Sequence, residues 1–165
     1  HGYPTEDGKS LYLLPHKADR EFLSDTSINQ NRLIASIQAT KPKSVFLFFD
    51  SCFSGLARSG ETLIANAKPI SLKTSNFEFP MNYTVFTASQ YDQLSSSSTD
   101  LKHGIFSYYL MKGMEGEADA NKDGKITLGE MQAYLLEQVS KHAGLVNRKQ
   151  IPQLFGDPDK VLIGK

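Results

Sequence analysis

The stretch Ser44-Val-Phe-Leu-Phe-Phe-Asp-Ser-Cys-Phe-Ser-Gly55 decides how this chain folds. Its first half, residues 45–49, is a continuous apolar run directly after a segment with helical spacing, which is typical of a strand buried on both faces of a parallel sheet. The run ends abruptly in the polar pair Asp50 and Ser51, and Cys52 follows. Because open parallel sheets bind ligands at the carboxyl ends of their strands, Cys52 lies in a candidate functional site.

The segments on either side of this run alternate between helical and extended patterns. Helical spacing of apolar residues is found in about 27–40, 105–114 and 128–142, and short apolar runs typical of strands occupy 10–14, 83–88 and 160–163. Either Ser27 or Thr26 is expected to cap the first helix. The alternation predicts an α/β fold with a mostly parallel central sheet flanked by helices, and 165 residues fit one domain, 1–165.

The composition excludes several functional classes. The chain holds 18 basic and 18 acidic residues, which argues against binding nucleic acid or a membrane surface by bulk charge. The longest apolar run is too short to span a membrane, and no segment has the pattern of a signal peptide. Because Cys52 is the only cysteine, an intrachain disulfide and a multi-cysteine zinc site are both excluded.

The lone cysteine has three interpretations: a buried thiol, an intermolecular bridge or a reactive nucleophile. A lone cysteine is more often a small buried apolar residue than a nucleophile. A core cysteine would normally lie within the apolar run, whereas Cys52 follows Asp50 and Ser51 in a polar turn. Its position therefore favours the nucleophile.

A cysteine nucleophile needs a base to form its thiolate and an acid to protonate the leaving amine, and one histidine can do both. Of the four histidines, His16 and His142 lie in polar surroundings and are expected at the surface, while His103 precedes a predicted helix. His1 precedes Gly2, whose lack of a side chain lets its backbone N–H approach a substrate oxyanion. His1 is therefore the preferred candidate for the base.

Five segments along the chain form a combination that points to one family. They are His1-Gly2, the strand ending in Asp50-Ser-Cys-Phe-Ser-Gly55, the segments Phe86-Thr-Ala-Ser-Gln-Tyr-Asp-Gln93 and His103-Gly-Ile-Phe-Ser-Tyr-Tyr109, and Gln150-Ile-Pro-Gln153. In this order they resemble the caspase-like cysteine peptidases, among them the metacaspases and bacterial caspase-like proteins. The resemblance covers nearly the whole chain.

This resemblance implies a cysteine endopeptidase whose substrate is a peptide or protein. Cys52 would be the nucleophile, and His1 would act as general base and acid. The backbone N–H groups of Gly2 and Cys52 would form the oxyanion hole. The chemistry requires no cofactor.

The resemblance also implies an acidic pocket for the substrate residue before the cleaved bond, P1. Asp50 matches a residue that binds a basic P1 side chain, and Asp92 and Gln93 match a later loop with a similar role, which also contains Ser89. Carboxylates bind Arg and Lys through charge-assisted hydrogen bonds, so we expect cleavage after basic residues. The alternatives are that Asp50 caps local backbone N–H groups and that Asp92 is a turn residue.

Two features depart from the family pattern. Phe53 stands where metacaspases commonly have histidine. In the family fold, further strands precede the catalytic His-Gly pair, so the resemblance implies a caspase-like fold that lacks its first strands. An upstream fragment of the same polypeptide is then the expected partner, and an incomplete, inactive module is the alternative.

A second motif matches the twelve-residue EF-hand loop that binds calcium. Gly124 stands at the sharp turn, and the ligands implied by the spacing are the side chains of Asp119, Asn121, Asp123, Thr127 and Glu130 with the carbonyl of Lys125. Ca²⁺ is therefore the candidate cofactor. The alternative is that Thr127 and Glu130 form a capping box at the start of the next helix.

Two other functions stay open beside the peptidase. One is a catalytically inactive caspase-like interaction or signalling module with a calcium-responsive loop. The other, a serine hydrolase, is weaker because Ser54 does not stand in a Gly-x-Ser-x-Gly context.

Overall fold

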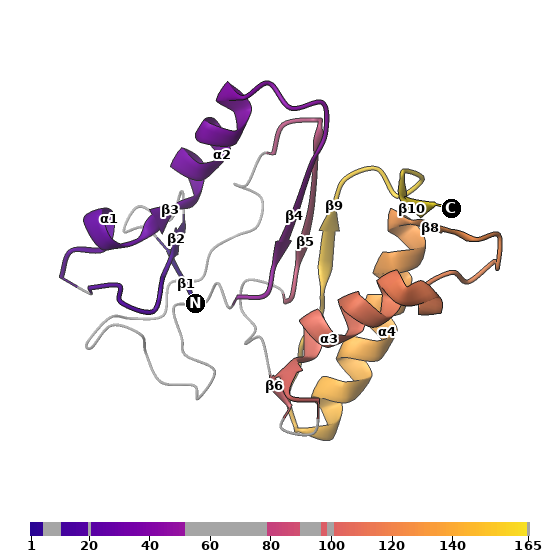
Figure 1. The fold of residues 1–165 in the computed structure, drawn as a ribbon. Coiled ribbons are helices and arrows are strands. Elements are labelled where there is room, and N and C mark those ends of the chain that lie inside the picture. The colour runs from indigo at the N-terminus through magenta and orange to yellow at the C-terminus, as the bar shows by residue number, and fades with distance from the viewer. Residues whose placement is uncertain (5–10, 20, 52–78, 90–96, 99–100, 165) are drawn as a thin grey trace.

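The computed structural model describes residues 1–4, 11–19, 21–51, 79–89, 97–98 and 101–164 (Figure 1). Cys52, Asp92 and Gln93 lie outside the described residues, as does Phe53. Among the described helices, none combines the length and apolar character needed to cross a membrane.

The central sheet has three described strands in the order β4-β5-β9 (Figure 1). Strands β4 (Val45–Phe49) and β5 (Tyr83–Thr87) are parallel, and β9 (Gln153–Phe155) runs antiparallel to β5. The α/β class is therefore confirmed. A mostly parallel sheet is not found among the described residues, because one of the two strand pairings is antiparallel.

The main core lies between this sheet and two helices, α3 (Ile105–Lys112) and α4 (Leu128–Leu145). The apolar stripe expected on α4 is confirmed, since Met131, Leu135 and Val139 are fully buried. Phe48 of β4 and Phe86 of β5 stack in the same core with ring centroids 5.6 Å apart. A π-helical turn, η2 (Gly113–Glu117), follows α3 directly.

Helix α2 (Gln30–Ala39) packs on a second, smaller cluster. Ile34 and Ile37 contact the group formed by Val45, Tyr83 and Val85, and the Tyr83 hydroxyl donates to the Ile34 carbonyl at 3.3 Å. The prediction of Ser27 or Thr26 as N-cap is wrong. Asn29 caps the helix by accepting the Arg32 N–H at 3.1 Å, because the chain first forms a short strand at 28–29.

The remaining strands form three small antiparallel sheets. The first has the order β1-β2-β3 and consists of β1 (Gly2–Pro4), β2 (Leu11–Leu13) and β3 (Ile28–Asn29), with the short helix α1 (Leu23–Thr26) between the last two. The others pair β6 (Ser97–Ser98) with β7 (His103–Gly104), and β8 (Lys125–Thr127) with β10 (Val161–Gly164). The strands expected near 10–14 and 160–163 are thus confirmed.

Candidate active site

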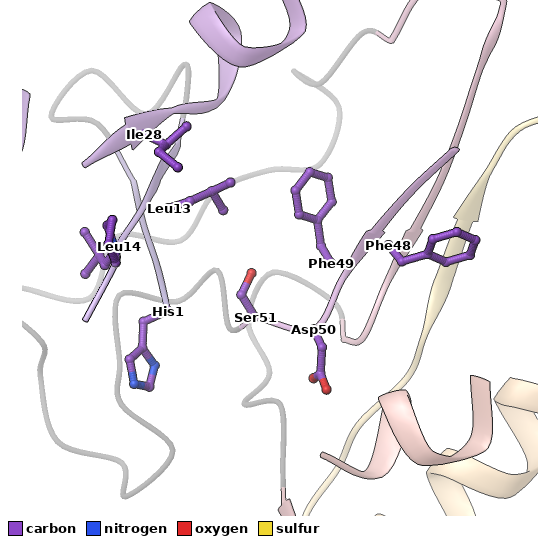
Figure 2. A pocket seen from close by; sticks show the side chains of 9 residues that line it. His1, Leu13, Leu14, Ile28, Phe48, Phe49, Asp50 and Ser51 are labelled. Carbon is purple, nitrogen blue, oxygen red and sulfur yellow. The ribbon is translucent and has the colours of Figure 1, made fainter. Parts of the chain in front are cut away.

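A pocket of about 300 Å³ lies between the β1-β2-β3 sheet and the carboxyl end of β4 (Figure 2). Most of its lining is apolar and includes Leu13, Ile28 and Phe49. Its polar lining residues are His1, which precedes β1, and the pair Asp50 and Ser51, which follows β4. The structure therefore brings the predicted base to the same pocket as the residue that directly precedes Cys52.

His1 is held at the pocket by the first sheet. Its carbonyl oxygen accepts the Leu14 N–H at 2.8 Å, and the next residue, Gly2, is buried and paired with Leu13. The His1 side chain is exposed, and Figure 2 shows its imidazole directed away from the apolar side chains of Leu13 and Ile28. An imidazole in this position remains accessible to solvent and to a substrate.

Ser51 carries a buried hydroxyl that has no hydrogen-bond partner. A buried hydroxyl without a partner is costly, by about 1–3 kcal/mol, because it has lost its hydrogen bonds to water. Figure 2 shows this side chain turned toward the space between Leu13 and Phe49. The pocket thus contains an unmet hydrogen-bonding group beside the turn that leads to Cys52.

Asp50 turns instead toward the start of α3. Its Oδ2 accepts a hydrogen bond from the Ser107 hydroxyl at 2.6 Å. A methyl group at Gly104, the N-cap of α3, would collide with the same oxygen, so the carboxylate packs closely on that glycine. The structure therefore gives Asp50 a side-chain partner on a distant helix. A carboxylate has about four acceptor sites, so this bond is compatible with substrate binding.

The exit of β5 lies beside the exit of β4, because the Ala88 N–H donates to the Phe49 carbonyl at 2.8 Å. Ser89 is buried there, and its carbonyl accepts from the Thr87 hydroxyl at 3.2 Å. The predicted substrate residues Asp92 and Gln93 follow in the same segment but lie outside the described residues. The two strand exits that the sequence singled out are thus direct neighbours.

A buried glutamine that the sequence interpretation gave no role of its own holds this second exit. Gln150 is fully buried, and its Nε2 donates to the Ala88 carbonyl at 3.0 Å. The backbone carbonyl of Gln150 accepts a hydrogen bond from the Ser140 hydroxyl of α4 at 3.0 Å. Gln150 follows the polar residues Asn147, Arg148 and Lys149, so the sequence carried no local signal of its burial.

The loop 119–130 folds around the carboxylate of Asp119. The backbone N–H groups of Asp123 and Gly124 donate to its two oxygens at 3.2 and 3.0 Å, and the Lys125 N–H donates to Asp123 Oδ1 at 2.8 Å. Gly124 has φ of +79°, the left-handed conformation that a sharp turn needs and glycine adopts without strain. The carboxylate oxygens of this loop are metal ligands of the type that Ca²⁺ prefers.

The far end of the loop is occupied by the capping box that the sequence offered as the alternative. Glu130 Oε2 accepts the Thr127 N–H and hydroxyl, both at 2.9 Å, and the Glu130 N–H donates back to the hydroxyl at 3.2 Å. The hydrogen bonds from Thr127 lower the pKa of Glu130, and the bond from the Thr127 backbone N–H has the largest effect. Among the described residues, no three His, Cys, Asp or Glu side chains form a ready metal-binding group.

The chain matches no protein-family model and no curated protein.

Proposed function

We propose that this protein is a caspase-like cysteine endopeptidase that cleaves after Arg or Lys. One observation carries the proposal: His1 lines the same pocket as Ser51, the residue directly before the only cysteine, although His1 precedes a strand of one sheet and Ser51 follows a strand of another. A cysteine nucleophile and a histidine base must lie within hydrogen-bond reach of each other, so a shared pocket is the first requirement of this chemistry.

The reaction proceeds in two steps. His1 takes the thiol proton of Cys52, and the thiolate attacks the carbonyl carbon of the scissile peptide bond. The backbone N–H groups of Gly2 and Cys52 stabilise the oxyanion, and the C–N bond breaks as the imidazolium gives its proton to the leaving amine. Water, deprotonated by His1, then hydrolyses the acyl-enzyme and restores the thiol.

The preference for a basic P1 residue rests on Asp50, with Asp92 and Gln93 assigned by resemblance. Asp50 borders the pocket at the carboxyl end of β4, within two residues of the nucleophile. Its carboxylate forms a strong charge-assisted hydrogen bond with Arg or Lys and repels an acidic P1 side chain.

The test compares fluorogenic peptides that differ only in Arg, Lys or Asp at P1. We expect cleavage after Arg and Lys that is lost in Cys52→Ala, while the control variant Ser54→Ala keeps the activity and so separates the thiol from the nearby hydroxyl. Cleavage after Asp alone would contradict the acidic pocket. Equal cleavage by wild type and Cys52→Ala would contradict the peptidase itself.

We also propose that an upstream segment of the same polypeptide pairs with β4. In the described sheet β4 is an edge strand, and alternate residues of β4 bond on the β5 side. The Val45 N–H donates to the Asn82 carbonyl at 3.0 Å, and the Phe49 carbonyl also accepts a hydrogen bond on that side. The backbone groups of Phe46 and Phe48 therefore point to the other edge. An apolar edge strand of this kind accepts a further strand.

Amide hydrogen exchange tests this pairing on the chain with and without its upstream residues. We expect the Phe46 and Phe48 amides to exchange slowly only in the longer polypeptide, because a paired amide is protected. The Leu47 amide, on the β5 side, is the internal control and stays protected in both. Unchanged exchange at Phe46 and Phe48 would contradict the pairing.

The second candidate function is an inactive interaction or signalling module with a calcium-responsive loop. The wrapping of backbone N–H groups around Asp119 favours it, because the turn is already formed. When bound, Ca²⁺ would be held by Asp119, Asn121, Asp123 and Glu130, the Lys125 carbonyl and Thr127, and would supply positive charge that tightens the loop. The chemistry of Cys52 does not need it.

Calcium titration followed by melting temperature tests this function. Saturation at 100 times Kd would stabilise the fold by about 2.7 kcal/mol, and Asp119→Asn would abolish the shift. Asp157→Asn, which changes an exposed aspartate outside the loop, is the matched control. An identical shift in wild type and Asp119→Asn would contradict calcium binding by this loop.

A further inference from the structure

A hydrogen bond joins the turn before Cys52 to the first turn of α3. The Ser107 hydroxyl donates to Asp50 Oδ2 at 2.6 Å, between residues 57 positions apart in the sequence. Asp50 directly follows β4, and Ser107 is the third residue of α3. Both elements pack in the main core through Phe48 and Phe106, so the bond connects two well-anchored parts of the fold.

The surroundings restrict where the carboxylate can lie. Gly104, the N-cap of α3, makes no side-chain cap bond, and its missing side chain leaves the space that Asp50 Oδ2 occupies. The N-terminal end of a helix carries unpaired N–H groups and a partial positive charge, which favours an ionised carboxylate nearby. Figure 2 shows the Asp50 carboxylate directed away from the Ser51 side chain and toward a neighbouring helix.

An aspartate side chain has two rotatable bonds, so a carboxylate at the end of a strand can adopt several rotamers. The bond to Ser107 selects one of them, and the short distance of 2.6 Å is typical of a strong bond from a hydroxyl to a carboxylate. An ion pair with a P1 cation gains most when the acceptor is already oriented, because the ordering has been completed before binding.

We propose that Ser107 is a positioning residue for P1 specificity: its hydroxyl orients the Asp50 carboxylate so that it accepts the basic P1 side chain. This inference rests on the proposed function, since it assumes that Asp50 meets the substrate. Ser107 itself does not touch the substrate.

The test uses Ser107→Ala, with Ser107→Thr as the conservative variant that keeps a hydroxyl. The matched control is Ser36→Ala, whose hydroxyl bonds within α2 to the Arg32 carbonyl, away from the pocket. Each variant is assayed with two peptides that differ only in Arg or citrulline at P1, because citrulline has nearly the same shape without the charge. The measured quantity is the ratio of kcat/KM for the two peptides.

We expect Ser107→Ala to lower the Arg/citrulline ratio about tenfold, which corresponds to about 1.4 kcal/mol. Ser107→Thr and Ser36→Ala should keep the wild-type ratio. The rate of Cys52 alkylation by iodoacetamide should stay unchanged in all three, because the reagent does not use Asp50. In an Asp50→Asn background, Ser107→Ala should have no further effect on the ratio.

The other outcomes separate this inference from the proposed function. A wild-type preference for Arg that Ser107→Ala leaves intact would overturn the role of Ser107 and leave the peptidase standing. Equal losses for both peptides would also overturn it, because they would indicate a merely structural bond. Cleavage of both peptides by wild type with no preference for Arg would overturn the acidic pocket and the role of Ser107 together.

Discussion

The helices α2 and α4 lie near the same central sheet but bury very different surfaces. Helix α4 places five apolar residues in the main core, whereas α2 buries only Gln30, and the side-chain oxygen of that glutamine has no hydrogen-bond partner. Near α2, Phe22 and Ile28 are 57% and 47% exposed. Helix α4 therefore contributes much more to the buried core of the described residues than α2, in which no apolar residue is fully buried.

The candidate active site lies at the boundary between the amino-terminal and carboxyl-terminal halves of the chain. His1 comes from the poorly covered amino-terminal part, whereas Asp50 is tied to α3 in the well-packed part. Under the proposed function, a change in how the amino-terminal part is covered would therefore move the proposed base, His1, relative to the proposed nucleophile, Cys52. If the proposed upstream segment pairs with β4, we expect it to affect activity as well as stability.

The largest expected difference between the halves comes from the same substitution on each helix. Leu135→Ala on α4 should lower the free energy of unfolding by about 2–5 kcal/mol, because it leaves a cavity in a fully buried site. Leu33→Ala on α2 should cost about 1 kcal/mol, since Leu33 is only half buried. Urea unfolding of both variants measures the two values.

The same pair shows whether α2 stays uncovered in a longer polypeptide. If an upstream segment packs on α2, the cost of Leu33→Ala should rise toward that of Leu135→Ala when the segment is present. An equal loss of unfolding free energy for both variants in the 165-residue chain would contradict this difference, because it would mean that α2 is already as well packed as α4.

A second pair concerns glycines on the two ends of the carboxyl-terminal half. Gly104→Ala should destabilise the fold by about 1–3 kcal/mol, because its new methyl group would collide with the Asp50 carboxylate. Gly144→Ala, near the end of α4, meets no atom within 4 Å and should stabilise by about 0.5 kcal/mol. Thermal unfolding monitored by circular dichroism distinguishes the two signs. Equal stabilisation by both would show that Asp50 moves aside freely.

Local patterns in the sequence were sufficient for the parts of the fold that depend on local spacing. The continuous apolar run at 45–49 and the stripe of α4 gave the correct elements because strand and helix periodicity are properties of neighbouring residues. The antiparallel direction of β9 could not be predicted in this way, since it depends on how the chain returns after α4.

The hydrogen bonds between polar groups of the site could not be predicted from the sequence for a similar reason. Asp50 with Ser107 and Gln150 with Ala88 join residues 57 and 62 positions apart, and no local pattern encodes such pairs. The meeting of His1 with the end of β4 was predicted through a family resemblance rather than from spacing. The residues alone predicted that Cys52 follows a strand buried on both faces. The strand is confirmed, but its burial is wrong: β4 lies at the edge of the described sheet, where only Val45 is buried and Phe46 is exposed.

A third prediction tests how much the loop 119–130 contributes to the stable half. Thr127→Ala removes the hydroxyl that caps α4 and should cost about 1 kcal/mol at neutral pH, whereas Thr127→Ser should be close to wild type. The pKa of Glu130 is lowered in the fold, so its stabilising contribution is complete above its ordinary pKa of 4.5 and is lost as pH falls through the lower folded value. The cost of Thr127→Ala should therefore shrink in acid, which urea unfolding at both pH values measures. A cost that grows in acid would contradict the capping box.

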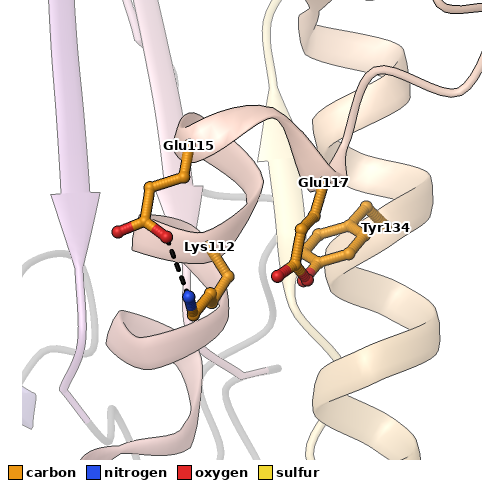
Figure 3. A network of polar contacts seen from close by, with 4 residues as sticks. All are labelled: Lys112, Glu115, Glu117 and Tyr134. Atoms are coloured by element: carbon orange, nitrogen blue, oxygen red, sulfur yellow. Dashed lines mark hydrogen bonds and ion pairs between the residues drawn. The ribbon is translucent and has the colours of Figure 1, made fainter.

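The smallest expected effect comes from the contact that joins η2 to α4 (Figure 3). The Tyr134 hydroxyl donates to Glu117 Oε2 at 2.6 Å, and Tyr134→Phe should cost about 0.5–1 kcal/mol because only one partly exposed hydrogen bond is lost. Burial has the largest effect on the pKa of Tyr134 and, with the bond to Glu117, raises it above its ordinary value of 10. The stability that the Tyr134 hydroxyl contributes is therefore complete below pH 10 and is lost as pH rises through the folded pKa. Glu115→Gln, which breaks the exposed pair with Lys112, is the neighbouring control and should leave the stability unchanged within error. If Tyr134→Phe had no effect while Leu135→Ala remained costly, the stability of the carboxyl-terminal half would come from its apolar core alone, without a contribution from the polar contact beside the loop.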